Sequence, residues 1–155
     1  MSIVLANASD LGDVRSITRT TIGEIYPHYY PPGAVEFFLE HHNDKNIAAD
    51  ISDGIVFLCR DAENNTVGTV TIRKNEICRL FVLPKYQGKG YGKELLEFAE
   101  SEIAKHYSEI VIDASLSAKS IYLRRGYKET GYHTIKTDNG DHLCYDVMKK
   151  ELSGR

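Results

Sequence analysis

The sequence has no tryptophan and only three cysteines in 155 residues. Cys59, Cys78 and Cys144 are odd in number, widely spaced and never part of a C-x-x-C pair. This pattern excludes a disulfide framework and a cysteine-based zinc site. Each cysteine lies in an apolar or strand-like run, so we expect three reduced thiols in the core of a cytoplasmic protein.

Long apolar runs and an excess of positive charge are also missing. No window approaches 18 apolar residues, and the first ten residues lack the basic and apolar segments of a signal peptide. We therefore expect no membrane segment. The 19 Lys and Arg residues are outnumbered by 22 Asp and Glu, for a net charge of −3. Because binding to nucleic acid or anionic lipid depends on a basic face, this balance argues against both as partners.

No cluster of metal-ligating residues stands out. His41 and His42 are adjacent, and adjacent residues of a helix point about 100° apart, so the two side chains cannot share a metal ion. We interpret them as a solvated helix end. No H-x-x-x-H pattern or Cys/His cluster is present, and we expect no metal.

The chain is long enough to form one self-sufficient domain over residues 1–155. Hydrophobic periodicity predicts an α+β fold with a mixed central sheet flanked by helices, in the order β-α-α-β-β-β-α-β-α-β-β. The expected crossover between parallel strands runs from 77 to 112. Four helices are expected: one over about 10–26, one from 33 to 43, one that follows the glycine-rich segment and ends at about 106, and one over 118–125. A short helical turn is expected at 45–52. The expected strands are 3–5, 55–59, 67–73, 76–82, 110–112, 127–137 and 142–150.

A glycine-rich segment, Gln87–Gly92, leads from a strand into a helix. It does not fit a Walker A loop, whose pattern is Gly-x-x-x-x-Gly-Lys-Ser/Thr. Counted from Gly88, Lys93 stands at the position of the second glycine and Glu94 at the position of the lysine. It does not fit a dinucleotide fingerprint either, which would need glycine at position 93. A strand, a glycine turn and a helix N-terminus nevertheless form an anion site. Lys85, Lys89 and Lys93 favour a polyphosphate, and an ordinary turn with solvated lysines is the alternative.

Two segments together resemble the GNAT family of N-acetyltransferases. Gln87, Gly90 and Gly92 match the family's acyl-CoA-binding signature, Gln/Arg-x-x-Gly-x-Gly/Ala. The segment from Ala118 to Tyr127 is similar to the family's second stretch, Ala-x-x-x-Tyr-x-x-x-Gly-Phe/Tyr. The expected order of elements is also that of the family, and the resemblance is most specific over residues 77–127.

The resemblance implies a GNAT fold and acetyl-CoA as co-substrate. It implies that the backbone amides of the loop bind the pyrophosphate, that the preceding strand pairs with the pantetheine arm, and that the Val82 amide is an oxyanion donor. Ser115 stands where the family often has asparagine, which puts one contact to the pantetheine in doubt. The implied cofactor-binding residues are Leu80, Phe81, Val82, Gln87, Gly88, Lys89, Gly90, Tyr91, Gly92, Lys93, Ser115 and Tyr122.

Acyl transfer from a thioester to an amine requires a neutral amine, a stabilised oxyanion and a proton for the leaving thiolate. An ordinary alkylamine has a pKa of about 10.4, so a base or a water chain must take its proton near pH 7. Tyr122 resembles the general-acid tyrosine of the family, although it could simply be a core aromatic. Glu76 and Asp113 are candidate bases; Glu76 could instead belong to a polar turn, Asp113 could cap one, and water could carry the proton.

The acceptor pocket is expected between the first two helices and the last hairpin. The segment from Tyr26 to Pro32 combines tyrosines and a histidine with prolines, which could form a rigid wall for the alkyl body of an amine. A packed connector between helices is the alternative. The candidate substrate-binding residues are Glu24, Tyr26, His28, Tyr29, Tyr30 and His133.

We therefore expect an N-acetyltransferase that transfers the acetyl group of acetyl-CoA to a primary amine by direct attack through a tetrahedral intermediate. Two other hypotheses stay open: a catalytically silent acyl-CoA-binding sensor of the same fold, and a nucleotide-phosphate binder. The sequence does not decide among a small molecule, an amino acid, a polyamine and a protein amine as acceptor. It also leaves open the acyl chain length and whether the protein is a monomer or a homodimer.

Overall fold

The computed structural model describes residues 1–152, which form one mixed sheet of seven strands. The strands lie in the order β1-β2-β3-β4-β5-β7-β6, and every neighbouring pair is antiparallel except β4 and β5. This confirms the expected fold class and the parallel crossover. The strands are β1 (Ser2–Leu5), β2 (Val56–Arg60), β3 (Thr66–Arg73), β4 (Glu76–Val82), β5 (Glu109–Ala114), β6 (Lys128–Lys136) and β7 (His142–Glu151).

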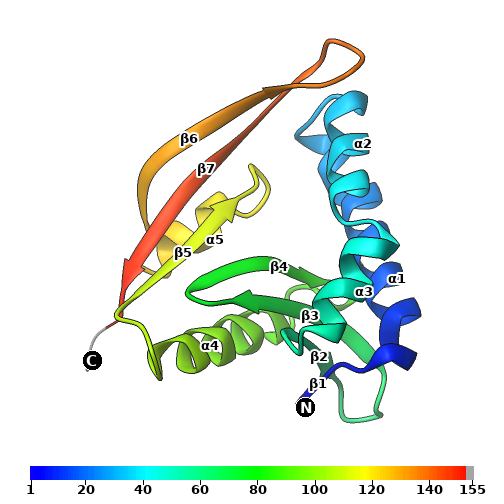
Figure 1. The fold of residues 1–155 in the computed structure, drawn as a ribbon, viewed down its shortest axis with the longest axis vertical. Helices are drawn as coiled ribbons and strands as arrows, with labels where there is room; N and C mark the ends of the chain where they lie inside the picture. The colour runs from blue at the N-terminus through cyan, green and yellow to red at the C-terminus, as the bar shows by residue number, and fades with distance from the viewer. Residues whose placement is uncertain (153–155) are drawn as a thin grey trace.

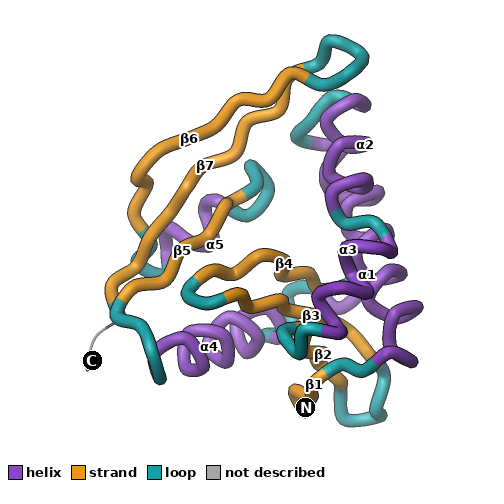
Figure 2. Tube along the Cα trace, viewed as in Figure 1, coloured by secondary structure: helices purple, strands orange, loops and turns teal. Residues whose placement is uncertain are grey.

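Helices cover both faces of the sheet (Figures 1 and 2). α1 (Leu11–Ile25), α2 (Pro32–His41) and α3 (Asp44–Ser52) pack on one face. α4 (Tyr91–Ala104) and α5 (Lys119–Arg124) pack on the other. Single turns of 3-10 helix precede α1, follow it and follow β4; they are η1 (Ala8–Asp10), η2 (Tyr26–His28) and η3 (Pro84–Tyr86).

Two expectations from the sequence need correction. α3 is a complete helix rather than a short turn, because the Asn43 side chain caps it by accepting a hydrogen bond of 2.8 Å from the Asn46 N–H. Only Cys59 is buried; Cys78 is half-buried and Cys144 is exposed. On β7 the side chains alternate, so burial of Leu143 turns Cys144 outward.

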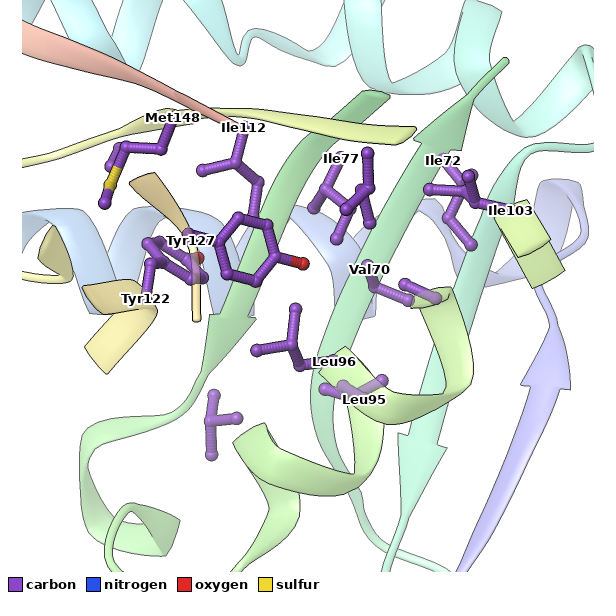
Figure 3. Packing of buried hydrophobic residues seen from close by; sticks show 14 of the residues in the cluster. Val70, Ile72, Ile77, Leu95, Leu96, Ile103, Ile112, Tyr122, Tyr127 and Met148 are labelled. Atoms are coloured by element: carbon purple, nitrogen blue, oxygen red, sulfur yellow. The ribbon is translucent and has the colours of Figure 1, made fainter. Parts of the chain in front are cut away.

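The main core lies between the sheet and α4 (Figure 3). The apolar positions of α4 recur at helical spacing, which places Leu95, Leu96, Ala99 and Ile103 on one buried stripe. Strand alternation supplies the other half of this core, with Ile77 and Val82 turned toward α4 while Phe81 of the same strand packs with α1 and α2. β4 is therefore buried on both sides and held in place by both helical layers.

β4 and β5 are paired over only a short distance. Glu76 lies opposite Val111 and Ile77 opposite Ile112, and no later pair is found between them in residues 1–152. At the same point the β3–β4 register shifts: Ile72 lies opposite Ile77, but Thr71 lies opposite Arg79, which leaves Cys78 as an extra residue. A bulge of this kind bends its strand. The two central strands consequently diverge beyond Ile77.

The turn between β6 and β7 reaches across to the start of α2 (Figure 1). α2 begins at Pro32 and has no side-chain cap from its own segment. Asp141 of the turn supplies one, since its Oδ2 accepts a hydrogen bond of 2.8 Å from the Gly33 N–H. Gly33 has no side chain, and the space beside it is filled by the amide of Asn139. This contact ties the last hairpin to the first helical layer.

Substituting Asp141 with alanine should loosen this connection. Loss of the cap removes about 1 kcal/mol from the free energy of unfolding, because the Gly33 N–H loses its partner. Asp138→Ala is the matched control, since Asp138 lies in the same turn and is exposed. Urea denaturation followed by circular dichroism compares the two. Equal stability of both variants and the unmodified protein would contradict a role for this contact.

Candidate functional site

Two cavities meet where β4 and β5 diverge. One, of about 460 Å³, lies against the glycine-rich loop, and we call it the glycine-loop cavity. The other, of about 380 Å³, lies under the end of α2, and we call it the α2 cavity. They share one wall, formed by Tyr26, Leu80, Phe81, Ser115, Ala118 and Tyr122.

The glycine-loop cavity receives the N-terminus of α4. Gly88 and Gly90 have φ values of 78° and 94°, which only glycine adopts without strain. Gly90 is the N-cap of α4 and offers no side chain to the free N–H groups of the first turn. A Cβ atom at either glycine would meet no other atom within 4 Å. The loop therefore presents backbone N–H groups and the positive end of the helix dipole to an open space, which suits a phosphate.

Cationic side chains lie close to these N–H groups. Lys93, Arg124 and Arg125 line the cavity. Arg125 also pairs with Glu100 at 2.8 Å, so part of its charge is already neutralised. Lys85 and Lys89 lie over the ring of Tyr86 instead of on the cavity wall.

One edge of β4 faces the cavity. The Leu83 N–H donates to the Val67 carbonyl of β3, at 2.9 Å, so strand alternation turns the backbone of Val82 and Leu80 to the opposite side. β5 has diverged on that side. The Val82 carbonyl accepts a hydrogen bond of 2.9 Å from Gln87 Nε2, which fixes the loop to the strand. An extended ligand with amide groups, lying in the cavity, can form hydrogen bonds with this edge as a neighbouring strand would.

Tyr122 lies at the junction of the two cavities. Its ring packs edge-to-face on Tyr127, with centroids 5.6 Å apart, in the core shown in Figure 3. Burial, and secondarily Tyr26, raises the pKa of the Tyr122 phenol, so it stays protonated at neutral pH. No hydrogen-bond partner for its hydroxyl is found in residues 1–152. The hydroxyl of this buried side chain is thus free to make a hydrogen bond in the cavity wall.

The α2 cavity holds the two carboxylates considered as bases. Glu76, at the start of β4, and Asp113, near the end of β5, both line it. Burial, and then the charge of Asp113, raises the pKa of Glu76, while Arg73 opposes the shift. Burial also raises the pKa of Asp113, against the opposing effect of His133 and His41. Raised pKa values make both groups stronger bases than ordinary carboxylates.

In the segment from Tyr26 to Tyr30, one tyrosine lines the cavities and another holds the segment against the sheet. Tyr26 lines both cavities and is buried. Burial raises its pKa, and a hydrogen bond to Ser115 partly offsets this. Tyr30 lines neither; its hydroxyl accepts from the Leu116 N–H at 2.8 Å and donates to the Cys144 carbonyl at 3.0 Å, which joins the connector to the sheet.

The remaining predicted site residues lie outside both linings. The 3-10 turn that buries Tyr26 leaves His28 and Tyr29 in solvent, and Glu24 is exposed on α1. His133 is exposed on β6, where its ring lies 5.2 Å from that of Tyr145, a residue of the α2 cavity wall. Lys89 and Tyr91 belong to the loop but do not line the cavity. These six positions therefore stay predictions from the sequence.

Sequence reasoning missed several lining residues. Arg124 and Arg125 could have been predicted, because two arginines stand directly before Gly126 in the motif that contains Tyr122. His42 and Arg79 could not have been predicted, because they are 37 residues apart in the chain and meet only in the folded structure. His42 is not a solvated helix end: it lines the α2 cavity and accepts a hydrogen bond of 3.2 Å from Arg79 Nε.

Residues 1–152 contain neither a candidate metal cluster nor a membrane-spanning helix. No group of three or more His, Cys, Asp or Glu side chains in this part of the chain is placed to hold a metal ion. None of its helices is long and apolar enough to cross a membrane.

Comparison with known proteins places this geometry in a family. Residues 25–152 match the family model described as acetyltransferase (GNAT) domain. An N-alpha-acetyltransferase of Saccharolobus solfataricus is 24% identical, over 86% of each chain. A GCN5-related N-acetyltransferase from Rhodopseudomonas palustris has a similar structure, with a TM-score of 0.88 and 21% identity over 97% of this chain and 95% of that one. The PaiA N-acetyltransferase from Thermoplasma acidophilum, solved in complex with coenzyme A, gives a TM-score of 0.73 and 23% identity over 98% and 100%.

The two buried tyrosines of the core should respond differently to loss of the hydroxyl. Tyr122→Phe should leave the free energy of unfolding nearly unchanged, because no protein partner is lost. Tyr127→Phe should lower it by about 2 kcal/mol, because Tyr127 donates to the Glu100 carboxylate at 2.9 Å. Chemical denaturation of the three proteins measures both. A large loss in Tyr122→Phe would show that its hydroxyl has a structural partner.

Proposed function

The chain belongs to the GNAT family of acetyltransferases, and from this premise we propose that it acts as an N-acetyltransferase that moves the acetyl group of acetyl-CoA to a primary amine. The observation that carries the proposal is the split between β4 and β5. It joins an anion-binding loop to a cleft lined by carboxylates and aromatic rings. A thioester lying in the split would be open to an amine from the opposite side.

The glycine-loop cavity fits coenzyme A by its chemistry. The free N–H groups at Gly90 and the first turn of α4 suit the pyrophosphate, and Lys93 and Arg124 add positive charge. The exposed edge of β4 at Leu80 and Val82 suits the amides of the pantetheine arm. Ile25 and Ile121 supply apolar contact along the same wall. The CoA complex of the Thermoplasma acidophilum protein, which has the same fold, supports this assignment.

The residues at the junction divide the chemical work. We assign the Val82 N–H to the oxyanion, because it faces the split at the end of β4. Tyr122 donates a proton to the departing thiolate, for which its protonated, unpartnered hydroxyl is suited. Glu76 takes the proton of the amine, directly or through water, with Asp113 as a second carboxylate that raises its basicity.

The cofactor assignment predicts a stability change on ligand binding. Acetyl-CoA at 100 times its Kd should raise the free energy of unfolding by about 2.7 kcal/mol. ATP and NAD at equal concentration should not. Gly90→Val should abolish the effect, because the side chain enters the space at the α4 N-terminus. Thermal unfolding with each ligand measures it.

Gly54→Val is the matched control for backbone strain. Gly54 also has a positive φ, 73°, and open space around it, but it lies in the turn after α3, away from the loop. It should lose stability and keep the response to acetyl-CoA. Absence of any response in the unmodified protein would refute the proposed cofactor.

Activity should follow the ionisation of Glu76. Because its pKa is raised, the rate should fall with decreasing pH at a higher pH than the ordinary glutamate value of about 4.3 would give. Asp113→Asn removes a neighbouring negative charge and should move this limb of kcat/KM to lower pH. Glu76→Gln should lower kcat about 100-fold and remove the limb. An unchanged pH profile in Glu76→Gln would reject it as the base.

Tyr122→Phe tests the general acid separately. We expect kcat to fall about 100-fold while the affinity for acetyl-CoA stays within a few-fold, because the hydroxyl acts on the leaving group. Steady-state kinetics and titration calorimetry measure the two quantities. Equal kcat in Tyr122→Phe and the unmodified enzyme would remove Tyr122 from the mechanism.

A further inference from the structure

His42 is the residue of the α2 cavity that the proposed mechanism leaves unused. It is the C-cap of α2, and its ring packs edge-to-face on Phe81 with centroids 5.8 Å apart. Phe81 lines both cavities. His42 is therefore one side chain away from the junction where the thioester would lie.

Arg79 determines which ring nitrogen of His42 carries the proton. Arg79 Nε lies 3.2 Å from His42 Nδ1, and a guanidinium can only donate, so Nδ1 is the acceptor and the proton of the neutral ring resides on Nε2. Arg79 cannot turn away. Its Nη1 donates to Thr71 at 2.8 Å, its Nη2 donates to Asp50 at 3.2 Å, and its side chain is only 3% exposed.

The same surroundings keep the His42 ring uncharged. Burial, then the charges of Arg79 and His41, lowers its pKa to about 3. The facing carboxylate of Asp50 is shared between Arg79 and Arg73 and does not contact the histidine. His42 can thus neither accept a proton from an amine nor attract one by charge. What it offers is its Nε2–H, for which no partner is found in residues 1–152.

The cavity contains complementary groups at its other positions. Glu76 and Asp113 suit the amine end of an acceptor, and the rings of Phe37, Phe38 and Tyr145 suit an apolar side chain. A neutral N–H donor beside them suits an oxygen acceptor. A polyamine or a plain alkylamine has no such oxygen and would leave the His42 donor desolvated without a partner.

From this arrangement we propose that His42 is a specificity residue whose Nε2–H binds a carbonyl or carboxylate oxygen close to the reacting amine, so that the acceptor is an α-amino-acid unit. The inference rests on the proposed N-acetyltransferase activity. Either a free amino acid or the N-terminal residue of a peptide provides the same oxygen. Arg79 acts through His42, as the residue that sets its tautomer.

Matched acceptors test the proposal by kinetics. Phenylalaninamide and phenylalanine carry the oxygen, and phenethylamine is the same amine without the carboxamide or carboxylate group. His42→Phe should lower kcat/KM about tenfold for the first two and should not lower it for phenethylamine, which has no oxygen to lose as a partner. His42→Gln should retain most of the kcat/KM for these two acceptors, because the side-chain N–H of glutamine can replace the Nε2–H of histidine. Comparing each variant with the unmodified enzyme on the same acceptor cancels the different amine pKa values.

The outcomes separate the possible failures. A preference for phenylalaninamide over phenylalanine identifies a peptide N-terminus, and the reverse identifies a free amino acid. An equal loss on all three acceptors, or no loss on any, would overturn the role of His42 while leaving the acetyltransferase activity in place. Absence of acetyl transfer to every primary amine would instead reject the proposed function.

Nitrogen NMR of the unmodified protein gives a test that needs no turnover. With labelled histidine, His42 should show an unprotonated Nδ1 and a protonated Nε2 that do not titrate between pH 5 and 8. Phenylalaninamide should shift the Nε2–H signal, and phenethylamine should not. A protonated Nδ1, or equal shifts with both compounds, would overturn the proposal even if the variants failed to fold.

Discussion

The divergence of β4 and β5 after Ile77 is the constraint on which the rest of the site depends. Parallel strands normally continue side by side, because each unpaired backbone group in the interior costs about 1–3 kcal/mol. Here the pairing stops after two residue pairs, next to the bulge at Cys78. The exposed edge of β4 is kept accessible, and its last carbonyl is satisfied by the side chain of Gln87. The site is thus an interruption of the sheet, stabilised by helical layers on both of its faces.

Identical residue types have different roles around this interruption, and their partners distinguish them. Tyr127 donates to Glu100, and Tyr30 bridges the Leu116 N–H and the Cys144 carbonyl, so both phenols hold elements together. Tyr122 is also buried but has no such partner in residues 1–152, which is why we propose a chemical role for its hydroxyl. The same reasoning separates the two positively charged residues of β3 and β4: Arg79 is fully engaged below the α2 cavity, whereas Arg73 is half-exposed at its edge.

Much of the fold and the position of the glycine-rich loop could be predicted from the sequence, because local signals determine them. The loop from Gln87 to Gly92, the strand before it and the helix after it are contiguous, so their arrangement follows from turn chemistry and periodicity. The α2 cavity is assembled from distant segments, and no local pattern reports that Arg79 reaches His42. In the tyrosine-rich segment after α1, only Tyr26 lines the two cavities, and which rings point inward depends on the 3-10 turn at Tyr26. The exposure of Cys144 likewise depends on strand alternation set by Leu143.

Amide hydrogen exchange of the protein with and without acetyl-CoA tests the central claim most directly, because it reports where the ligand lies before any reaction. We predict new protection at the backbone amides of Leu80 and Val82 and of Gly88 to Lys93, with little change in β1, β2 or the β6–β7 turn. Protection confined to other segments, or none with acetyl-CoA at saturating concentration, would contradict the assignment of the split between β4 and β5 as the place where acetyl transfer occurs.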